Sequence, residues 1–213
     1  MDREQLMEVI AAYEERIDSG GELPFVARGQ LARELRGSLN GLSGADSFLV
    51  RVGLECARFS WHVWGRKFPG ENDIIDTAVK AVDGIADEGK ADEGVVAELG
   101  GLLAHLHGKF ELGDEYFAGI YAGYAAWAVV RDAVSLGQGE DPLASSGPEL
   151  EVNSDDWEPC FFSSLAIVGG STWDGFDNPD ARRGFWKWYL TSAVPVAYNQ
   201  VTQRADHDDD RLS

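Results

Sequence analysis

The chain has 213 residues, of which 44% are hydrophobic, and it contains seven Trp. This length suits one sizeable core or at most two small ones, and this composition excludes an intrinsically disordered chain. The formal net charge is −19, from 18 basic and 37 acidic side chains. Such a surface repels nucleic acid and anionic lipid and attracts cationic partners. Solubility, or adaptation to a salty cytoplasm, explains the same charge without any function, and a GC-rich coding bias that favours few Lys explains part of it.

Two features bear on the compartment. Residues 1–4 open a polar helix rather than a secretory signal. The longest uncharged apolar run, residues 116–130, falls short of the roughly 20 residues that span a bilayer. We therefore expect a cytoplasmic protein without membrane association. Cys56 and Cys160, the only cysteines, lie in apolar segments, which predicts buried reduced thiols rather than a disulfide framework.

Apolar residues recur at spacings of three and four through the first two thirds of the chain, which predicts amphipathic helices. Asp46 is a candidate N-cap for a helix that runs to about Arg66. Asp114 precedes a second long helix, residues 115–136, where Gly119 and Gly123 leave room for close approach of a neighbour. The stripe of that helix is Ile120, Tyr124, Trp127 and Ala128. The remaining stripes are Leu6, Ile10, Tyr13 and Ile17; Leu31, Leu35 and Leu39; Ile75, Val79, Val82 and Ile85; and Val95, Leu99, Leu102, Leu103 and Leu106.

The last third is organised differently. Residues 137–153 are rich in Gly, Pro, Ser and acids, which predicts a long surface loop. A short buried element follows and stops at Gly169-Gly170. Asp177 or Asn178 then caps the last long helix, which Pro195 should kink or end because it lacks the backbone donor. We expect one all-α domain of about seven or eight helices over residues 1–200, and an acidic, disordered tail over residues 201–213.

The sequence carries few features typical of a catalytic site. His105 and His107 point about 200° apart on a helix, so they cannot share a metal ion. His62 lies between Trp61 and Trp64, which is typical of a core or boundary histidine. No P-loop, Gly-x-Ser-x-Gly motif or combination of nucleophile, base and oxyanion donor is present. We predict no enzyme, no cofactor and no metal. The alternative is a hydrolase whose acidic pocket would use Asp155, Asp156, Asp174 or His62.

Acidic residues concentrate between residues 71 and 98, where they are either a binding surface or the solvated side of two amphipathic helices. Trp188 points away from the other aromatics of its helix, and an exposed Trp is a common interface anchor. The predicted partner-binding residues are Asp73, Asp76, Asp83, Asp87, Glu88, Asp92, Glu93 and Trp188.

Aromatic motifs at defined spacing fill the C-terminal third. They are Asp155-Asp156-Trp157-Glu158, Phe161-Phe162-Ser163-Ser164-Leu165-Ala166, Gly169-Gly170-Ser171-Thr172-Trp173-Asp174, Asn178-Pro179-Asp180-Ala181-Arg182-Arg183-Gly184-Phe185-Trp186-Lys187-Trp188-Tyr189-Leu190 and Ala193-Val194-Pro195. The series resembles the fifth numbered family of predicted immunity proteins from bacterial polymorphic toxin systems, with a looser match over residues 54–69. Pro159, Cys160 and the tail after Asn199 depart from the family pattern.

The resemblance implies a largely α-helical, non-enzymatic protein, encoded beside a toxin whose activity it blocks. The acidic surface indicates a cationic partner, and toxins that hold nucleic acid are cationic. We therefore predict an immunity protein for a toxin domain, possibly a nuclease. The alternative is a helical scaffold or adaptor. The family-signature residues, which we expect to be structural, are Trp157, Gly169, Gly170, Trp173, Asp174, Phe185, Trp186, Tyr189, Leu190 and Pro195.

Overall fold

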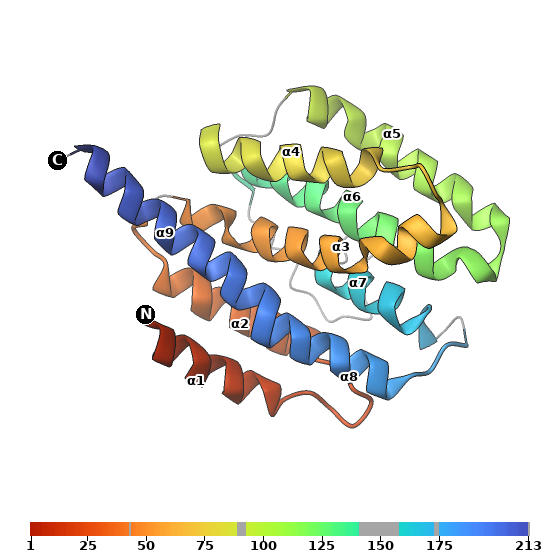
Figure 1. The fold of residues 1–213 in the computed structure, drawn as a ribbon, viewed down its shortest axis with the longest axis horizontal. Coiled ribbons are helices and arrows are strands. Elements are labelled where there is room, and N and C mark those ends of the chain that lie inside the picture. Colours follow the sequence, from red (N-terminus) through yellow and green to blue (C-terminus); the bar gives the residue numbers. More distant parts are fainter. Residues whose placement is uncertain (43, 89–92, 141–157, 173–174, 213) are drawn as a thin grey trace.

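The computed structural model describes residues 1–42, 44–88, 93–140, 158–172 and 175–212, with the side chains of residues 86–93 and 204–213 also left out. Within these ranges all regular structure is helical and no strand occurs, which confirms the predicted all-α class (Figure 1). The helices are α1 (Arg3–Glu14), α2 (Phe25–Ser38), α3 (Phe48–Lys67), α4 (Asp73–Glu88), α5 (Glu93–Lys109), α6 (Phe117–Gly137), α7 (Pro159–Val168), α8 (Pro179–Trp188) and α9 (Val194–Leu212).

Side-chain caps define the start of two helices. Asp2 and Gln5 form a capping box at α1, and the Asn178 side chain accepts a hydrogen bond from the backbone of Ala181 at 3.1 Å to start α8. The predicted cap at Asn178 is therefore confirmed. The predicted cap at Asp46 is wrong, because a 3₁₀ turn precedes α3 and the Asp46 carboxylate instead pairs with Arg36 at 2.9 Å.

Helix α3 joins two halves of the core. One face, with Leu54, Ala57 and Trp64, packs with α4, α5, α6 and α7. Its opposite side, with Phe48 and Cys56, packs with α1, α2 and the α8–α9 segment. In Figure 1, α4 and α5 accordingly lie on one side of α3, and α1, α2, α8 and α9 lie on the other. The described helices thus form one compact domain.

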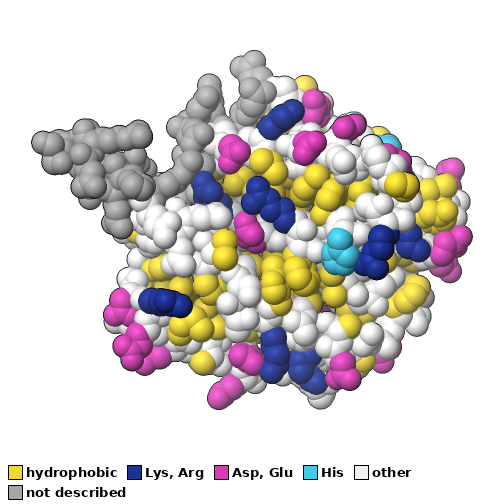
Figure 2. Space-filling view, viewed as in Figure 1, with side chains coloured by type: hydrophobic (Ala, Val, Ile, Leu, Met, Phe, Trp, Pro, Cys, Tyr) yellow, Lys and Arg dark blue, Asp and Glu magenta, His cyan; other side chains and the backbone are white. Residues whose placement is uncertain are grey.

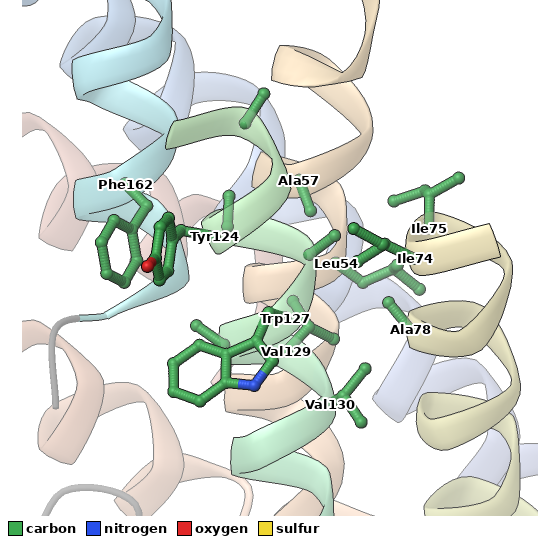
Figure 3. Close-up of a cluster of buried hydrophobic side chains, with 14 of the residues drawn as sticks. Leu54, Ala57, Ile74, Ile75, Ala78, Tyr124, Trp127, Val129, Val130 and Phe162 are labelled. Atoms are coloured by element: carbon green, nitrogen blue, oxygen red, sulfur yellow. The ribbon is translucent and has the colours of Figure 1, made fainter. Parts of the chain in front are cut away.

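Helix α6 is the most deeply buried helix of the first half. The sequence predicts one buried stripe, yet every residue from Gly119 to Val130 is buried. The reason is that α3, α4, α5 and α7 all pack around it, as expected for a helix that is apolar on all sides. Figure 3 shows Trp127, Val129 and Val130 of α6 among Leu54 of α3 and the Ile74–Ala78 segment of α4.

Pro195 does not end its helix. A π-helical turn, Tyr189–Ala193, connects α8 to α9, and Pro195 lies in the first turn of α9. A π turn changes the backbone hydrogen-bond spacing, which accommodates a residue without a backbone N–H. Pro195 therefore lies within one long helical rod, and the predicted alternative of an end there is wrong.

The sequence predicts two irregular regions, a loop over residues 137–153 and a tail over residues 201–213. Most of the predicted 137–153 loop lies outside the described residues, which end at Glu140 and resume at Glu158. The backbone of α9 is helical through Leu212, whereas the sequence predicts a disordered tail from residue 201. Because Val201 is packed in the core, the helix is already formed where the acidic tail begins, and it continues by adding one hydrogen bond per residue.

Candidate functional site

The outer face of α4 carries the predicted acidic surface. Asp73, Asp76 and Asp83 are exposed there, while Ile74, Ile75, Ala78, Ala81, Val82 and Ile85 are buried on the opposite face. Spacings of three and seven place these carboxylates along one stripe, in which Lys80 is also exposed. We call Asp73, Asp76, Lys80 and Asp83 the α4 stripe. The side chains of Asp87, Glu88 and Glu93, and all of Asp92, lie outside the described residues.

Polar contacts fix the start of the α4 stripe against α5. The buried Thr77 hydroxyl donates to the Asp73 carbonyl at 2.8 Å and to the Glu98 carboxylate at 3.2 Å. Glu71, just before α4, binds Lys109 of α5 at 2.8 Å and His105 at 3.2 Å. The hydrogen bond from Lys109, with a smaller contribution from His105, lowers the pKa of the Glu71 carboxyl. The stripe therefore lies on a positioned helix rather than on a loop.

Trp188 belongs to a different surface. It is half-buried, and its ring stacks on Phe59 of α3 with ring centroids 3.8 Å apart and planes 16° apart. Phe59 also meets His62 edge-on at 6.4 Å. Helix α8 packs on α7, whereas α4 packs on α3, α5 and α6. Among the described residues, the structure therefore places Trp188 on a different side of α3 from the α4 stripe.

The Arg-Arg pair of the family signature holds the loop between α1 and α2. Arg182 donates to the Gly20 carbonyl at 3.0 Å, and Arg183 donates to the Asp18 and Ser19 carbonyls. Gly21 has φ of +81°, and a Cβ there would clash with the Pro179 carbonyl oxygen at the start of α8. This loop can follow its path only because residue 21 is a glycine.

Most of the described signature residues are buried. Phe185, Trp186, Tyr189 and Leu190 all lie in the half of the core that contains α1, α2 and α9. Gly169, in the left-handed region at φ +107°, ends α7, and a Cβ at Gly170 would clash with the Phe176 ring. Pro195 is half-buried. Trp157, Trp173 and Asp174 lie outside the described residues.

A buried polar cluster, which we did not predict, lies between α2, α6 and α7. The Arg28 guanidinium, 3% exposed, binds Glu158 at 2.6 Å and Glu22 at 3.0 Å, and lies 5.0 Å from the Trp186 ring centroid. Arg28 and Glu158 are 130 positions apart, so no local pattern could have paired them. Only the presence of an Arg within the apolar positions of α2 hinted at a buried ion pair.

This cluster borders a small cavity of about 60 Å³, lined in part by Arg28, Asp132, Glu158, Cys160 and Tyr189. Burial raises the pKa of the Asp132 carboxyl, although the Arg131 guanidinium lies 2.6 Å away and opposes the shift. Burial also raises the pKa of the Cys160 thiol, which donates to Glu158 at 3.3 Å, and the pKa of the Tyr189 phenol. Such a space is large enough for water, since one molecule needs roughly 10–15 Å³.

The histidines and cysteines are the residues that would most readily form a catalytic or metal site. The hydrolase alternative would use His62 with Asp155, Asp156 or Asp174. His62 is exposed, and its Nδ1 lies 2.8 Å from the Phe59 carbonyl oxygen. The three acids lie outside the described residues. His105 lies beside Glu71, and His107 meets the Tyr124 ring at 5.9 Å. Cys56 and Cys160 are both buried and free, which confirms the predicted thiols. Within the described ranges, no group of three or more His, Cys, Asp or Glu could hold a metal ion.

Charges of both signs share the surface. Figure 2 shows basic and acidic side chains interspersed with hydrophobic ones on one face, rather than one continuous acidic sheet. Among the described residues, no helix is long and apolar enough to cross a membrane.

Comparison with known families shows the family to which the chain belongs. The family model of immunity protein Imm5 matches residues 10–196, which is most of the chain, and the chain belongs to this family. The resemblance inferred from the C-terminal motifs is therefore confirmed, and the match extends across α1 to α8 as well. A search of curated proteins found no match.

Proposed function

We propose that this protein binds a cognate toxin domain and neutralises it, and that the toxin meets the α4 stripe. The single observation that carries the proposal is membership of the Imm5 immunity family. The finer parts of the proposal are that the toxin belongs to a bacterial polymorphic toxin system, that it is cationic, as a nuclease would be, and that the two proteins meet in the cytoplasm.

The charge supports a cationic target. A net charge of −19 attracts a basic protein over about one Debye length, which is roughly 8 Å at physiological salt. Such steering raises association rates well above the usual range, which matters when a toxin must be intercepted before it acts. The exposed carboxylates of α4 are held on a packed helix, so they would meet the toxin without a large ordering cost.

Neutralisation by occupancy requires no chemistry of its own. The inhibitor has only to cover the toxin's substrate-binding surface, and a carboxylate stripe imitates the spaced negative charge of a phosphate backbone. A non-enzymatic role is part of the proposal and rests on the family's inhibitory function.

Calorimetry with the toxin domain encoded beside this gene tests the proposal. We expect tight binding that weakens as salt rises from 50 to about 500 mM. The variant D76K/D83K should bind at least about tenfold more weakly. The control E8K/E15K changes the net charge equally on exposed positions of the α1 region and should lose much less. Equal losses in both variants would reduce the effect to overall charge, and absence of binding to a folded, active toxin would refute the cognate partnership.

A further inference from the structure

A groove with the opposite charge lies between α3 and α7. Its lining residues are His62, Val63, Arg66 and Lys67 of α3 with Ala166 and Ile167 of α7, and its volume is about 430 Å³. Val63 and Ala166 are buried and form an apolar floor, while His62 and Arg66 are exposed at the surface. The groove therefore combines an apolar base with basic walls.

The Arg66 and Lys67 side chains of this groove have no acidic partner among the described residues. Arg66 donates only to the His62 carbonyl of its own helix, at 3.3 Å, and the Lys67 ammonium lies 5.8 Å from the Tyr116 ring centroid. Other basic residues of the chain do find carboxylates: Arg28, Arg36, Arg58, Arg131, Arg182, Arg183, Lys109 and Lys187. The groove therefore carries positive charge that no described carboxylate neutralises.

A row of stacked rings, His62, Phe59 and Trp188, adjoins the groove, and we call it the aromatic shelf. His62 packs edge-on against Phe59, which stacks on the half-buried Trp188. Exposed Arg and Trp are the residue types most enriched where protein interfaces concentrate their binding energy. The shelf would extend the contact area of a bound segment from α7 across α3 to α8.

This surface is separate from the α4 stripe. Helix α4 packs against one side of α3 and α6, and α7 packs against both of those helices from another side (Figure 1). A cationic toxin drawn to the α4 stripe would be repelled by Arg66 and Lys67. The groove therefore suits a chemically different contact from the one proposed above, and its existence does not depend on the toxin.

We propose that the α3–α7 groove binds an acidic segment of a protein. A carboxylate of that segment pairs with Arg66 and Lys67, and a neighbouring apolar side chain packs on Val63 and Ala166. A nucleic acid is the less suitable occupant, because a long polyanion would bring many phosphates against a protein of net charge −19, whereas a short segment brings one or two carboxylates.

Titration of the isotope-labelled full-length protein tests this, with amide chemical shifts as the measurement. The probe is a blocked peptide that alternates glutamate and leucine, and the matched peptide carries glutamine in place of glutamate. We expect shift changes around residues 62–67 and 166–167 with the acidic peptide, and at least about tenfold weaker binding of the glutamine peptide.

Two variants make the test specific. R66E/K67E should bind the acidic peptide at least about tenfold more weakly, while R3E/R33E, an equal charge change at exposed positions of α1 and α2, should bind it nearly as well as the unchanged protein. Absence of groove shifts at millimolar peptide would overturn the proposal. So would shifts centred elsewhere, or tighter binding of a single-stranded RNA at the same residues. Loss of toxin binding in D76K/D83K leaves this result unaffected, so the two proposals fail separately.

Discussion

Replacement of Gly123 by alanine tests the packing at the centre of the first core half. A Cβ on Gly123 would lie 2.5 Å from Leu106 Cδ2 and 2.5 Å from Trp64 Cζ3, well inside van der Waals contact. Both neighbours are fully buried, and Trp64 is further held because its indole N–H donates to the Glu71 carbonyl. Neither side chain can therefore move aside freely.

The expected net effect follows from two opposing contributions. Overpacking of a dense core costs about 1–3 kcal/mol, and alanine gains about 1 kcal/mol over glycine within a helix. Because the methyl meets two rigid neighbours, we expect the upper part of this range, a net loss of roughly 1–2 kcal/mol. For a chain of this length that corresponds to a melting temperature lower by roughly 2–8 °C.

The matched control is Gly100→Ala on α5, where a Cβ would meet nothing within 4 Å. There only the helix gain applies, and the variant should be more stable by about 0.5–1 kcal/mol. Urea unfolding followed by circular dichroism measures both. A Gly123→Ala protein as stable as the Gly100→Ala protein would show that α3, α5 and α6 do not approach as closely as described, and the reasoning would be refuted.

Two other predictions concern stability. Because Trp186 is fully buried, its replacement by alanine should lower the free energy of unfolding by about 3–5 kcal/mol, which corresponds to a fall in melting temperature of roughly 6–20 °C. A loss under about 1 kcal/mol in thermal unfolding would instead place the ring at the surface. Glu71→Gln should cost about 0.2–1 kcal/mol at pH 7, because the Glu71–Lys109 pair is partly exposed. The pair lowers the pKa of Glu71, so its contribution exists above the usual carboxyl pKa and is lost as pH falls through the lowered value. The difference in stability between the two proteins should therefore shrink as pH falls below the usual carboxyl pKa, and a constant difference across pH would contradict the assignment.

The spacing of apolar residues in the sequence predicted the helices and their buried faces well, but it did not predict how many neighbouring helices surround each one. The apolar stripe of α4 places Ile75, Val82 and Ile85 in the core, as the structure does, because spacings of three and four depend only on helix geometry. The same reasoning gave α6 one buried face, although it is covered on all sides. How many neighbours surround a helix is decided by tertiary packing, which a single periodicity does not contain.

Polar contacts between distant segments could not be predicted, for a similar reason. Arg28 and Glu158 meet across 130 positions, and Arg182 reaches the Gly20 carbonyl across 162. The two members of each pair lie in distant segments, so the local pattern of one segment cannot reveal its contact in the other. The aromatic signature around Phe185 was readable because its residues lie close in sequence. The cavity and the α3–α7 groove, each built from separate helices, had no such local signal.

The net charge of −19 therefore says less about binding than its distribution does. The α4 stripe and the α3–α7 groove have opposite charge and lie on different sides of α3. In a partner with separated basic and acidic regions, the basic region would be attracted to the α4 stripe and the acidic region to the α3–α7 groove. The two surfaces together would therefore favour one orientation of the approaching partner. Raised salt should then reduce the selectivity for that orientation as well as the rate of encounter. A partner of uniformly basic charge would instead lose rate alone, and association kinetics of D76K/D83K and R66E/K67E at two salt concentrations distinguish these cases.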